Sequence, residues 1–247
     1  MPFRDVVGHG PLLQLIAQAV SRDTLPPSLG FVGPDGVGKQ LAATALAQIL
    51  NCLSLVEIRP FVVDACGECD SCKKIVRGSF SDLLLVETIE NRSITIDQIR
   101  QVVQQVAYRP FEGRRRVVVI NDADRMNAEA QSSLLKTLEE PPDSSQFVLV
   151  TSRPDLLLLT VRSRIQQLNF VHLSADEVFQ VVRGLGVETA DAQLLAAAGG
   201  SAGRAVALAS GELVVARDAA VRLMEQVAIA RDGRARLVAA QEFVGAK

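Results

Sequence analysis

The stretch GPDGVGKQ, residues 33–40, decides the fold of this 247-residue chain. It follows the phosphate-loop template G-x-x-x-x-G-K, in which backbone N–H groups surround phosphate oxygens and the next helix points its positive end at them. The template ends in a Ser or Thr that binds Mg²⁺, whereas this chain has Gln40, whose amide oxygen lies on a longer side chain. The pattern favours nucleotide binding over efficient hydrolysis; the alternative is a glycine-rich turn that binds nothing. The residues expected to hold phosphate are Gly33, Gly36, Gly38, Lys39 and Gln40.

Strand-like and helix-like segments alternate on both sides of this loop. The run RVVVIND is typical of a parallel strand buried on both faces, Thr95 and Gln98 predict a capping box, and the prolines of EEPP end a helix. Such alternation predicts an α/β fold with a parallel sheet and ligands at the carboxyl ends of its strands. Helices are expected at residues 11–21, from the phosphate loop to about residue 50, at 95–106 and at 128–138, and strands at residues 29–32, 82–86, 116–122 and 147–152.

After residue 165 the pattern becomes helical. Short helical patterns at residues 174–185 and 190–198 are separated by glycines, and Gly199 and Gly200 precede an alanine-rich helical tail. We therefore expect a small helical domain over residues 166–210.

The composition predicts a soluble cytoplasmic protein. Hydrophobic residues make up 48% of the chain and aromatic residues only 4%, so the core is expected to be aliphatic. The net charge of −2 excludes a globally basic surface for nucleic acid but not a local patch. The longest uncharged run, residues 41–56, is too short to cross a bilayer, and the N-terminus lacks a signal-peptide core.

The four cysteines predict one structural Zn²⁺ site. Cys66, Cys69 and Cys72 form C-x2-C-x2-C, and Cys52 lies fourteen positions before the first of them. A two-residue gap lets a turn direct two thiolates at one tetrahedral ion, and four sulfur ligands leave no open position for catalysis. The alternatives are two disulfides, which need an oxidising compartment, or four free thiols.

Six stretches in a fixed order carry a family resemblance: GPDGVGKQ, the four cysteines, RVVVINDADRMN, SSLLKTLEEPP, FVLVTS and VRSRI. Together they resemble the ATPase-fold subunits of the bacterial sliding-clamp loader, the gamma/tau and delta-prime subunits of DNA polymerase III. LLKTLEEPP followed by RSR is more specific to these proteins than the phosphate loop. The resemblance covers residues 3–209. It implies an AAA+ domain at residues 1–165 with a zinc module at about 52–72, a helical lid domain at 166–210, and the start of a collar domain at 211–247.

Three departures from the motor subunits resemble the delta-prime subunit, a stator. Motor subunits end one strand in Asp-Glu, for Mg²⁺ and the attacking water, where this chain has Asn121 and Asp122. An amide lacks the charge that Mg²⁺ chemistry uses, and Asp122 is one methylene shorter than Glu. Motor subunits also have GSLRDA, with an Arg at the position of Gly203, whereas Arg204 follows one residue late, about 100° around a helix. Gln40 is the third departure, and ATP with Mg²⁺ is accordingly a doubtful cofactor.

The RSR motif is intact. The resemblance implies that Arg164 is an arginine finger acting in trans on ATP held by a neighbouring subunit, with Ile165 where Cys is usual. The alternative is an ordinary surface arginine. Thr151 and Ser152 lie where motor subunits keep a polar sensor for the γ-phosphate.

The resemblance also implies the partners: gamma/tau and delta subunits in a hetero-pentamer, the sliding clamp, and primed DNA. Contact with DNA is suggested by basic residues around one expected helix, which a solvated helix face explains equally well. These residues are Arg92, Arg100, Arg109, Arg114, Arg115 and Arg116. The competing functions are a gamma/tau-like ATPase motor and an unrelated phosphate-loop kinase, for which LLKTLEEPP and RSR are accidents.

Overall fold

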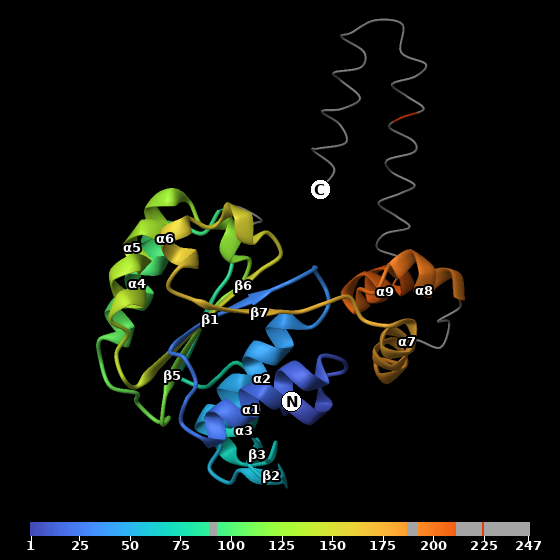
Figure 1. Cartoon of the computed structure of the whole chain (residues 1–247), viewed down its shortest axis with the longest axis horizontal. Coiled ribbons are helices and arrows are strands. Elements are labelled where there is room, and N and C mark those ends of the chain that lie inside the picture. Colours follow the sequence, from blue (N-terminus) through green and yellow to red (C-terminus); the bar gives the residue numbers. More distant parts are fainter. Residues whose placement is uncertain (89–92, 187–191, 211–223, 225–247) are drawn as a thin grey trace, which may run out of the picture. The chain divides into compact units, whose positions relative to one another are not determined.

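The computed structural model describes residues 1–88, 93–186, 192–210 and 224 and divides into two compact units, Met1–Leu173 and a second that begins at Ser174. The first unit holds a five-stranded parallel sheet with the strand order β4-β5-β6-β1-β7 (Figure 1). The parallel α/β fold predicted from the sequence is therefore confirmed. The strands are β1 (Ser28–Val32), β4 (Leu83–Val86), β5 (Arg116–Ile120), β6 (Ser145–Thr151) and β7 (Gln166–Asn169).

Helices cover both faces of this sheet (Figure 1). Alternate residues of β5 point to opposite sides: Val117 and Val119 pack with α1 and α2, whereas Val118 and Ile120 pack with α4 and α5. Both faces of the central strands β1, β5 and β6 are buried, which is why their sequences are mainly apolar. The helices are α1 (Gly10–Ser21), α2 (Lys39–Asn51), α3 (Asp70–Val76), α4 (Ile96–Val106), α5 (Ala128–Glu139) and α6 (Leu159–Arg162), with short 3-10 turns at Phe3–Asp5, Ala123–Arg125 and Pro154–Leu156.

Local signals set the start of α4 and the end of α5 within one residue of the predicted positions. The Thr95 side chain accepts from the Gln98 N–H while the Gln98 side chain accepts from the Thr95 N–H, so the capping box begins α4. Helix α5 ends at Glu139, just before two prolines. Within the described residues, every helix is too short or too polar to span a bilayer.

Several elements of the structure were not predicted. A hairpin of β2 (Val56–Arg59) and β3 (Val62–Asp64) and the helix α3 lie within the cysteine-containing insertion. Strand β7 pairs in parallel with β1, so residues 166–169 belong to the sheet rather than to the small helical domain expected from residue 166. The division falls after Leu173 instead, because Phe170 packs in the same core as β1.

The second unit contains three short helices: α7 (Ala175–Gly184), α8 (Ala192–Ala198) and α9 (Ala202–Ala209). Helix α7 begins with a capping box between Ser174 and Glu177. The start of the helix expected at residue 190 and, apart from Met224, the tail expected at 211–247 lie outside the described residues.

Candidate functional site

The phosphate loop joins the carboxyl end of β1 to the first residue of α2. Gly36 and Gly38 have φ of 72° and 99°, a conformation that favours glycine. A Cβ added to Gly33 would lie 2.3 Å from the carbonyl oxygen of Phe170, so only glycine fits there. The loop is also held from outside, because the His9 Nε2 lies 3.0 Å from the Val37 carbonyl oxygen. Local geometry thus accounts for each of the three predicted glycines.

Lys39 turns back onto its own loop. Its Nζ donates to the carbonyl oxygens of Gly33 and Pro34 at 2.6 Å each and lies 3.8 Å from Asp35 Oδ1, and only 6% of the side chain is exposed. Burial lowers the pKa of Lys39, and the nearby carboxylates of Asp35, Asp122 and Asp124 oppose that shift. The predicted phosphate ligand is therefore a buried cation bound to loop carbonyls.

The Glu87 carboxylate bonds to both side chains that the sequence places near a bound metal, Gln40 and Asn121. Its Oε1 accepts from Gln40 Nε2 at 3.1 Å and from Asn121 Nδ2 at 2.9 Å. Both amides therefore direct N–H groups, not oxygens, at a carboxylate. Asn121 is 7% exposed, and its Oδ1 has no hydrogen-bond partner within the described part of the chain.

Two aspartates, Asp122 and Asp124, follow strand β5 and lie near the phosphate-loop lysine. Asp122 is exposed and lies in the left-handed region, with φ of 47°, whereas Asp124 points at Thr151. The Thr151 hydroxyl donates to Asp124 Oδ1 at 2.6 Å, and Arg153 donates to Asp124 Oδ2 at 2.9 Å. Although burial raises the pKa of Asp124, these two contacts lower it below its ordinary value. The Thr151 hydroxyl, which the resemblance placed as a sensor of the γ-phosphate, therefore donates its hydrogen bond to Asp124.

The four cysteines converge on one point. Their ligand atoms all lie within 4.8 Å of one another, with Cys52 Sγ at 3.5 Å from Cys66 Sγ and 4.0 Å from Cys69 Sγ. Four sulfurs that each lie about 2.3 Å from a tetrahedral Zn²⁺ are about 3.8 Å apart, which matches these separations. All four cysteines are free, so the disulfide alternative is wrong in this structure. The cluster can bind a metal ion.

Main-chain N–H groups favour the thiolate form of one cysteine of this cluster, Cys66. Burial acts to raise the pKa of Cys66, but the N–H groups of Cys69 and Glu68 lower it to about 6. Burial raises the pKa of Cys52 and that of Cys72. Arg4 ties the N-terminal segment to the cluster, because it donates to the Cys66 carbonyl oxygen at 2.9 Å.

Arg164 lies between α6 and β7 and is one-third exposed. Its Nη2 lies 2.5 Å from Glu139 Oε1, and its Nη1 donates to the Thr160 carbonyl oxygen at 2.8 Å. The next residue, Ile165, is buried against Gly30, where an added Cβ would lie 2.8 Å from Ile165 Cδ1. Arg164 is thus held in place by its own chain rather than projecting freely.

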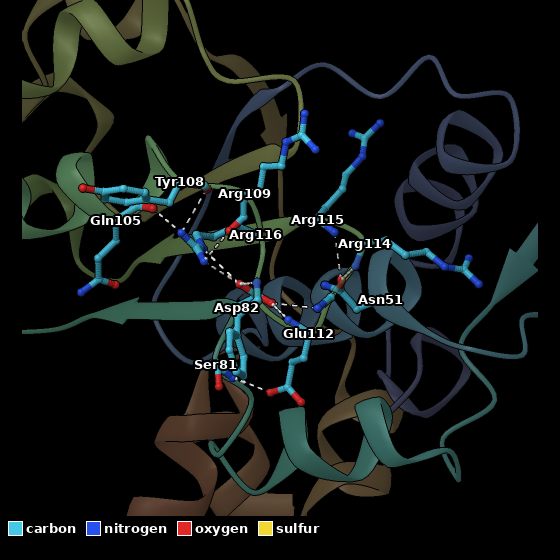
Figure 2. A network of polar contacts seen from close by, with 12 residues as sticks. Asn51, Ser81, Asp82, Gln105, Tyr108, Arg109, Glu112, Arg114, Arg115 and Arg116 are labelled. Atoms are coloured by element: carbon cyan, nitrogen blue, oxygen red, sulfur yellow. Dashed lines mark hydrogen bonds and ion pairs between the residues drawn. The ribbon is translucent and has the colours of Figure 1, made fainter.

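A network of polar contacts lies at the other end of the sheet, where the strands begin (Figure 2). It includes one of the arginines that the sequence placed on a basic surface. Arg116 is 8% exposed and pairs with the fully buried Asp82 at 2.8 Å, so its expected place in a DNA-contacting patch is wrong. Arg100 is exposed beside Asp97, and Arg92 lies outside the described residues. The other exposed members are Arg109 and Arg114, with Arg115 partly buried.

Sequence reasoning missed Glu87, Asp124 and Glu139. Glu87 immediately follows an expected strand, so its position at the carboxyl edge was a usable signal. Glu139 lies within LLKTLEEPP, but its pairing with Arg164 joins residues 25 positions apart and has no local signature. The side chains of Gln40, Glu87 and Asn121 are brought together only by the parallel strand order.

A parallel sheet with a phosphate loop after β1 and a buried lysine at its helix start defines a phosphate-loop α/β protein. A family model described as DNA polymerase III, delta subunit, matches residues 8–174. The chain belongs to this family of DNA polymerase III clamp-loader proteins, as its motifs predicted.

Similar proteins agree with this family. The delta' subunit of DNA polymerase III from Pseudomonas aeruginosa is 36% identical over 173 residues, covering 68% of this chain and 51% of the relative. The tau subunit from Escherichia coli is 35% identical over 179 residues, covering 72% of this chain and 26% of the relative. This chain therefore spans about a quarter to a half of the length of these relatives.

A solved structure supports the fold. The Thermotoga maritima RuvB Holliday junction branch migration motor matches with a TM-score of 0.53 at 16% identity, over 97% of this chain and 70% of the other. Identity this low supports similarity of fold alone.

Proposed function

We propose that this chain is a delta-prime-type stator of the bacterial DNA polymerase III clamp loader, which helps to load the sliding clamp onto primed DNA. One observation carries the proposal: the amides of Gln40 and Asn121 both donate to Glu87, where a motor subunit needs oxygen ligands for Mg²⁺. The proposed partners are gamma/tau and delta subunits in a hetero-pentamer, the clamp, and DNA phosphates, in the cytoplasm.

The remaining parts of the chain fit this role. The four-cysteine cluster is proposed to hold a structural Zn²⁺, because four sulfurs leave no position for a reacting water. The unit that begins at Ser174 is proposed to be the lid, and residues 211–247 the start of the collar. Any ATP held by the loop would contact Gly33, Gly36, Gly38 and Lys39, with Gln40 and Asp122 at its metal side.

Arg164 is proposed to act on ATP in the neighbouring subunit. A guanidinium stabilises charge on γ-phosphate oxygens, and fingers of this type are worth about 10³ or more in rate. Glu139 is proposed to hold Arg164 before assembly, since the pair is short but partly exposed. Such a pair contributes only about 1 kcal/mol or less to stability, so releasing Arg164 to a phosphate costs little.

The test is ATP hydrolysis by the loader reconstituted with this chain. Arg164→Ala should remove the turnover of the one site that it serves, while leaving the zinc content of the isolated chain unchanged and lowering its free energy of unfolding by about 1 kcal/mol or less. Arg164→Lys should rescue poorly, because a point charge does not reproduce the planar fork that meets two phosphate oxygens. Arg183→Ala, which removes an exposed arginine of α7, is the control. Unchanged ATPase and clamp loading with Arg164→Ala would contradict the role in trans.

The second candidate function is a gamma/tau-like ATPase motor. The favouring observation is the loop backbone, in which Gly36 and Gly38 have positive φ shortly before Lys39, the first residue of α2. A motor would hydrolyse ATP bound to its own loop, so Lys39-dependent turnover by the isolated chain separates the two.

A further inference from the structure

The segment between α4 and β5 carries the two most exposed aromatic side chains of the described residues. Phe111 is 84% exposed and Tyr108 is 74% exposed, although only 4% of the chain is aromatic and most of the other described rings are buried. A single exposed apolar residue is ordinary on a protein surface. Two rings three positions apart on one short segment, both with few contacts to the fold, are better suited to bind a ligand than to stabilise the core. We call residues 108–115 the aromatic loop.

Buried polar side chains fix the main chain of the aromatic loop (Figure 2). The Asp82 carboxylate accepts from the three N–H groups of residues 111–113 at 2.8 to 2.9 Å. Asn51 Oδ1 accepts from the N–H groups of residues 114 and 115 at 2.9 and 3.0 Å. The guanidinium of Arg116 donates to two carbonyl oxygens at the start of the loop, at 3.2 Å each. Because the backbone is already ordered, a ligand of this loop does not have to supply the free energy of ordering it.

Two arginines beside the rings have charges that the fold does not use. Glu112 pairs with Lys74, and Arg115 pairs with an aspartate that follows α1. Arg109 and Arg114 are exposed and form no ion pair with any residue that the structure describes. Figure 2 shows their side chains directed away from the polar network. The loop therefore presents positive charge to solvent next to its aromatic rings.

Rings and guanidinium groups on one loop match the chemistry of single-stranded nucleic acid. Each nucleotide offers a phosphate to a guanidinium and a flat base to an aromatic ring, and such stacking tolerates any base. In a duplex the base faces are stacked on one another and are closed to the rings. An acidic peptide would pair with the arginines but offers no repeated flat ring. The combination therefore favours a single strand over both alternatives.

We propose that the aromatic loop binds single-stranded nucleic acid, with bases stacked on Tyr108 and Phe111 and phosphates paired with Arg109 and Arg114. The loop lies at the end of the sheet where β5 begins, whereas the phosphate loop follows the end of β1. The two sites are therefore separate. The inference goes beyond the proposed function, which includes DNA phosphates as a partner but assigns them no residues, and it holds whether or not the chain is a stator.

The chain supplies its own probe for this proposal. It has one tyrosine and no tryptophan, so its intrinsic tyrosine fluorescence reports Tyr108 alone. Titrating the full chain at low salt with an oligothymidylate of about twelve nucleotides should quench this fluorescence, with a dissociation constant in roughly the micromolar range. A duplex of the same length should leave the emission unchanged. N-acetyltyrosinamide titrated in parallel corrects for absorption by the oligonucleotide.

Substitutions then test the residues, with the anisotropy of a fluorescein-labelled oligothymidylate as the readout. Tyr108→Ala and Phe111→Ala should each weaken binding about tenfold, the loss of one stacked base, whereas Tyr108→Phe keeps the ring and should retain the affinity. Arg109→Gln should weaken binding and lower the slope of log K against log salt by about 0.7. Phe61→Ala is the control, because Phe61 is 63% exposed in the β2–β3 turn and also has a guanidinium, that of Arg22, 5.8 Å from its ring.

Absence of oligothymidylate binding by the folded chain at low salt would overturn the proposal, as would an equal loss in Phe61→Ala. Unchanged affinity in Tyr108→Ala and Phe111→Ala, with a loss only in Arg109→Gln, would leave a phosphate contact without stacking and would also overturn it. If these alanine variants bind the oligonucleotide normally but are lost from a reconstituted loader, the loop serves a protein partner instead. All the substituted side chains are exposed, so urea unfolding should show unchanged midpoints. Unchanged loader ATPase with Arg164→Ala, which contradicts the in-trans role, leaves these binding results unaffected.

Discussion

Asp82 precedes strand β4 and Glu87 follows it. The two carboxylates therefore lie at opposite ends of the parallel strands: Asp82 at the amino edge of the sheet, where the strands begin, and Glu87 at the carboxyl edge, where they end. Asp82 is fully buried and accepts from the N–H groups of Phe111, Glu112 and Gly113 and from the guanidinium of Arg116 (Figure 2). Glu87 is exposed and its carboxylate accepts from two side-chain amides. The Asp82 carboxylate is bound by main-chain N–H groups and a buried arginine and stabilises the fold. The Glu87 carboxylate is bound by the side-chain amides of Gln40 and Asn121, which lie where a nucleotide and its metal would be expected.

Metal removal should give the largest difference between the two edges. Asn51, which accepts from the N–H groups of Arg114 and Arg115, directly precedes Cys52, and Lys74 after the cluster pairs with Glu112. A structural Zn²⁺ supplies on the order of 10 kcal/mol to a small module, so chelation should unfold the insertion. Hydrogen exchange should then rise at residues 111–115 and stay unchanged at residues 33–40.

Metal analysis of chain purified without chelator checks the premise of that experiment, with about one Zn²⁺ expected per chain. Finding no zinc, or equal exchange at both edges after chelation, would break the comparison. Replacing Cys72 with Ser should reproduce the chelation result, because it removes one of the four sulfur ligands of the cluster.

Neutralising the two carboxylates should separate structure from ligand control. Asp82→Asn leaves Arg116 buried without its charge partner and should lower the free energy of unfolding by about 3–5 kcal/mol. Glu87→Gln should change it by less than about 0.5 kcal/mol, as expected for an exposed side chain. Urea unfolding measures both, and similar losses in the two variants would contradict the division between edges.

Acid should weaken the Asp82 edge through a smaller, pH-dependent effect. Burial acts to raise the pKa of Asp82, but its main-chain donors and Arg116 lower it below the ordinary value of 3.8. A lowered carboxyl pKa contributes stability above the unfolded-state pKa, and that stability is lost as the pH falls through the folded-state pKa. The free energy of unfolding should therefore fall below about pH 4, less steeply in Asp82→Asn. Parallel slopes in the two proteins would show that Asp82 is not responsible.

The sequence predicted what depends on local patterns. The apolar runs of β1, β5 and β6, the capping box of α4 and the glycines of the loop each follow from short-range chemistry. The cysteine spacing likewise predicted a cluster that the structure brings together.

The missed features depend on contacts between distant residues. Strand β7 is polar and lies at the sheet edge, so residues 166–169 lack the apolar run of a central strand. All four residues of β2 are exposed, so no buried face gave that strand a period-two pattern. Arg116 reads as one of three consecutive basic residues, and only the fold shows that it is buried against Asp82.

The central claim is that the carboxyl edge of this sheet carries a phosphate loop without motor chemistry. Single-turnover ATP hydrolysis by the isolated chain, with protein in excess over ATP and Mg²⁺ present, tests it most directly. The account predicts no turnover above that of a Lys39→Ala variant, because Gln40 and Asn121 offer Glu87 their N–H groups and leave the metal unsupported. Lys39-dependent hydrolysis at the rate of a tau or gamma subunit measured alongside would contradict it.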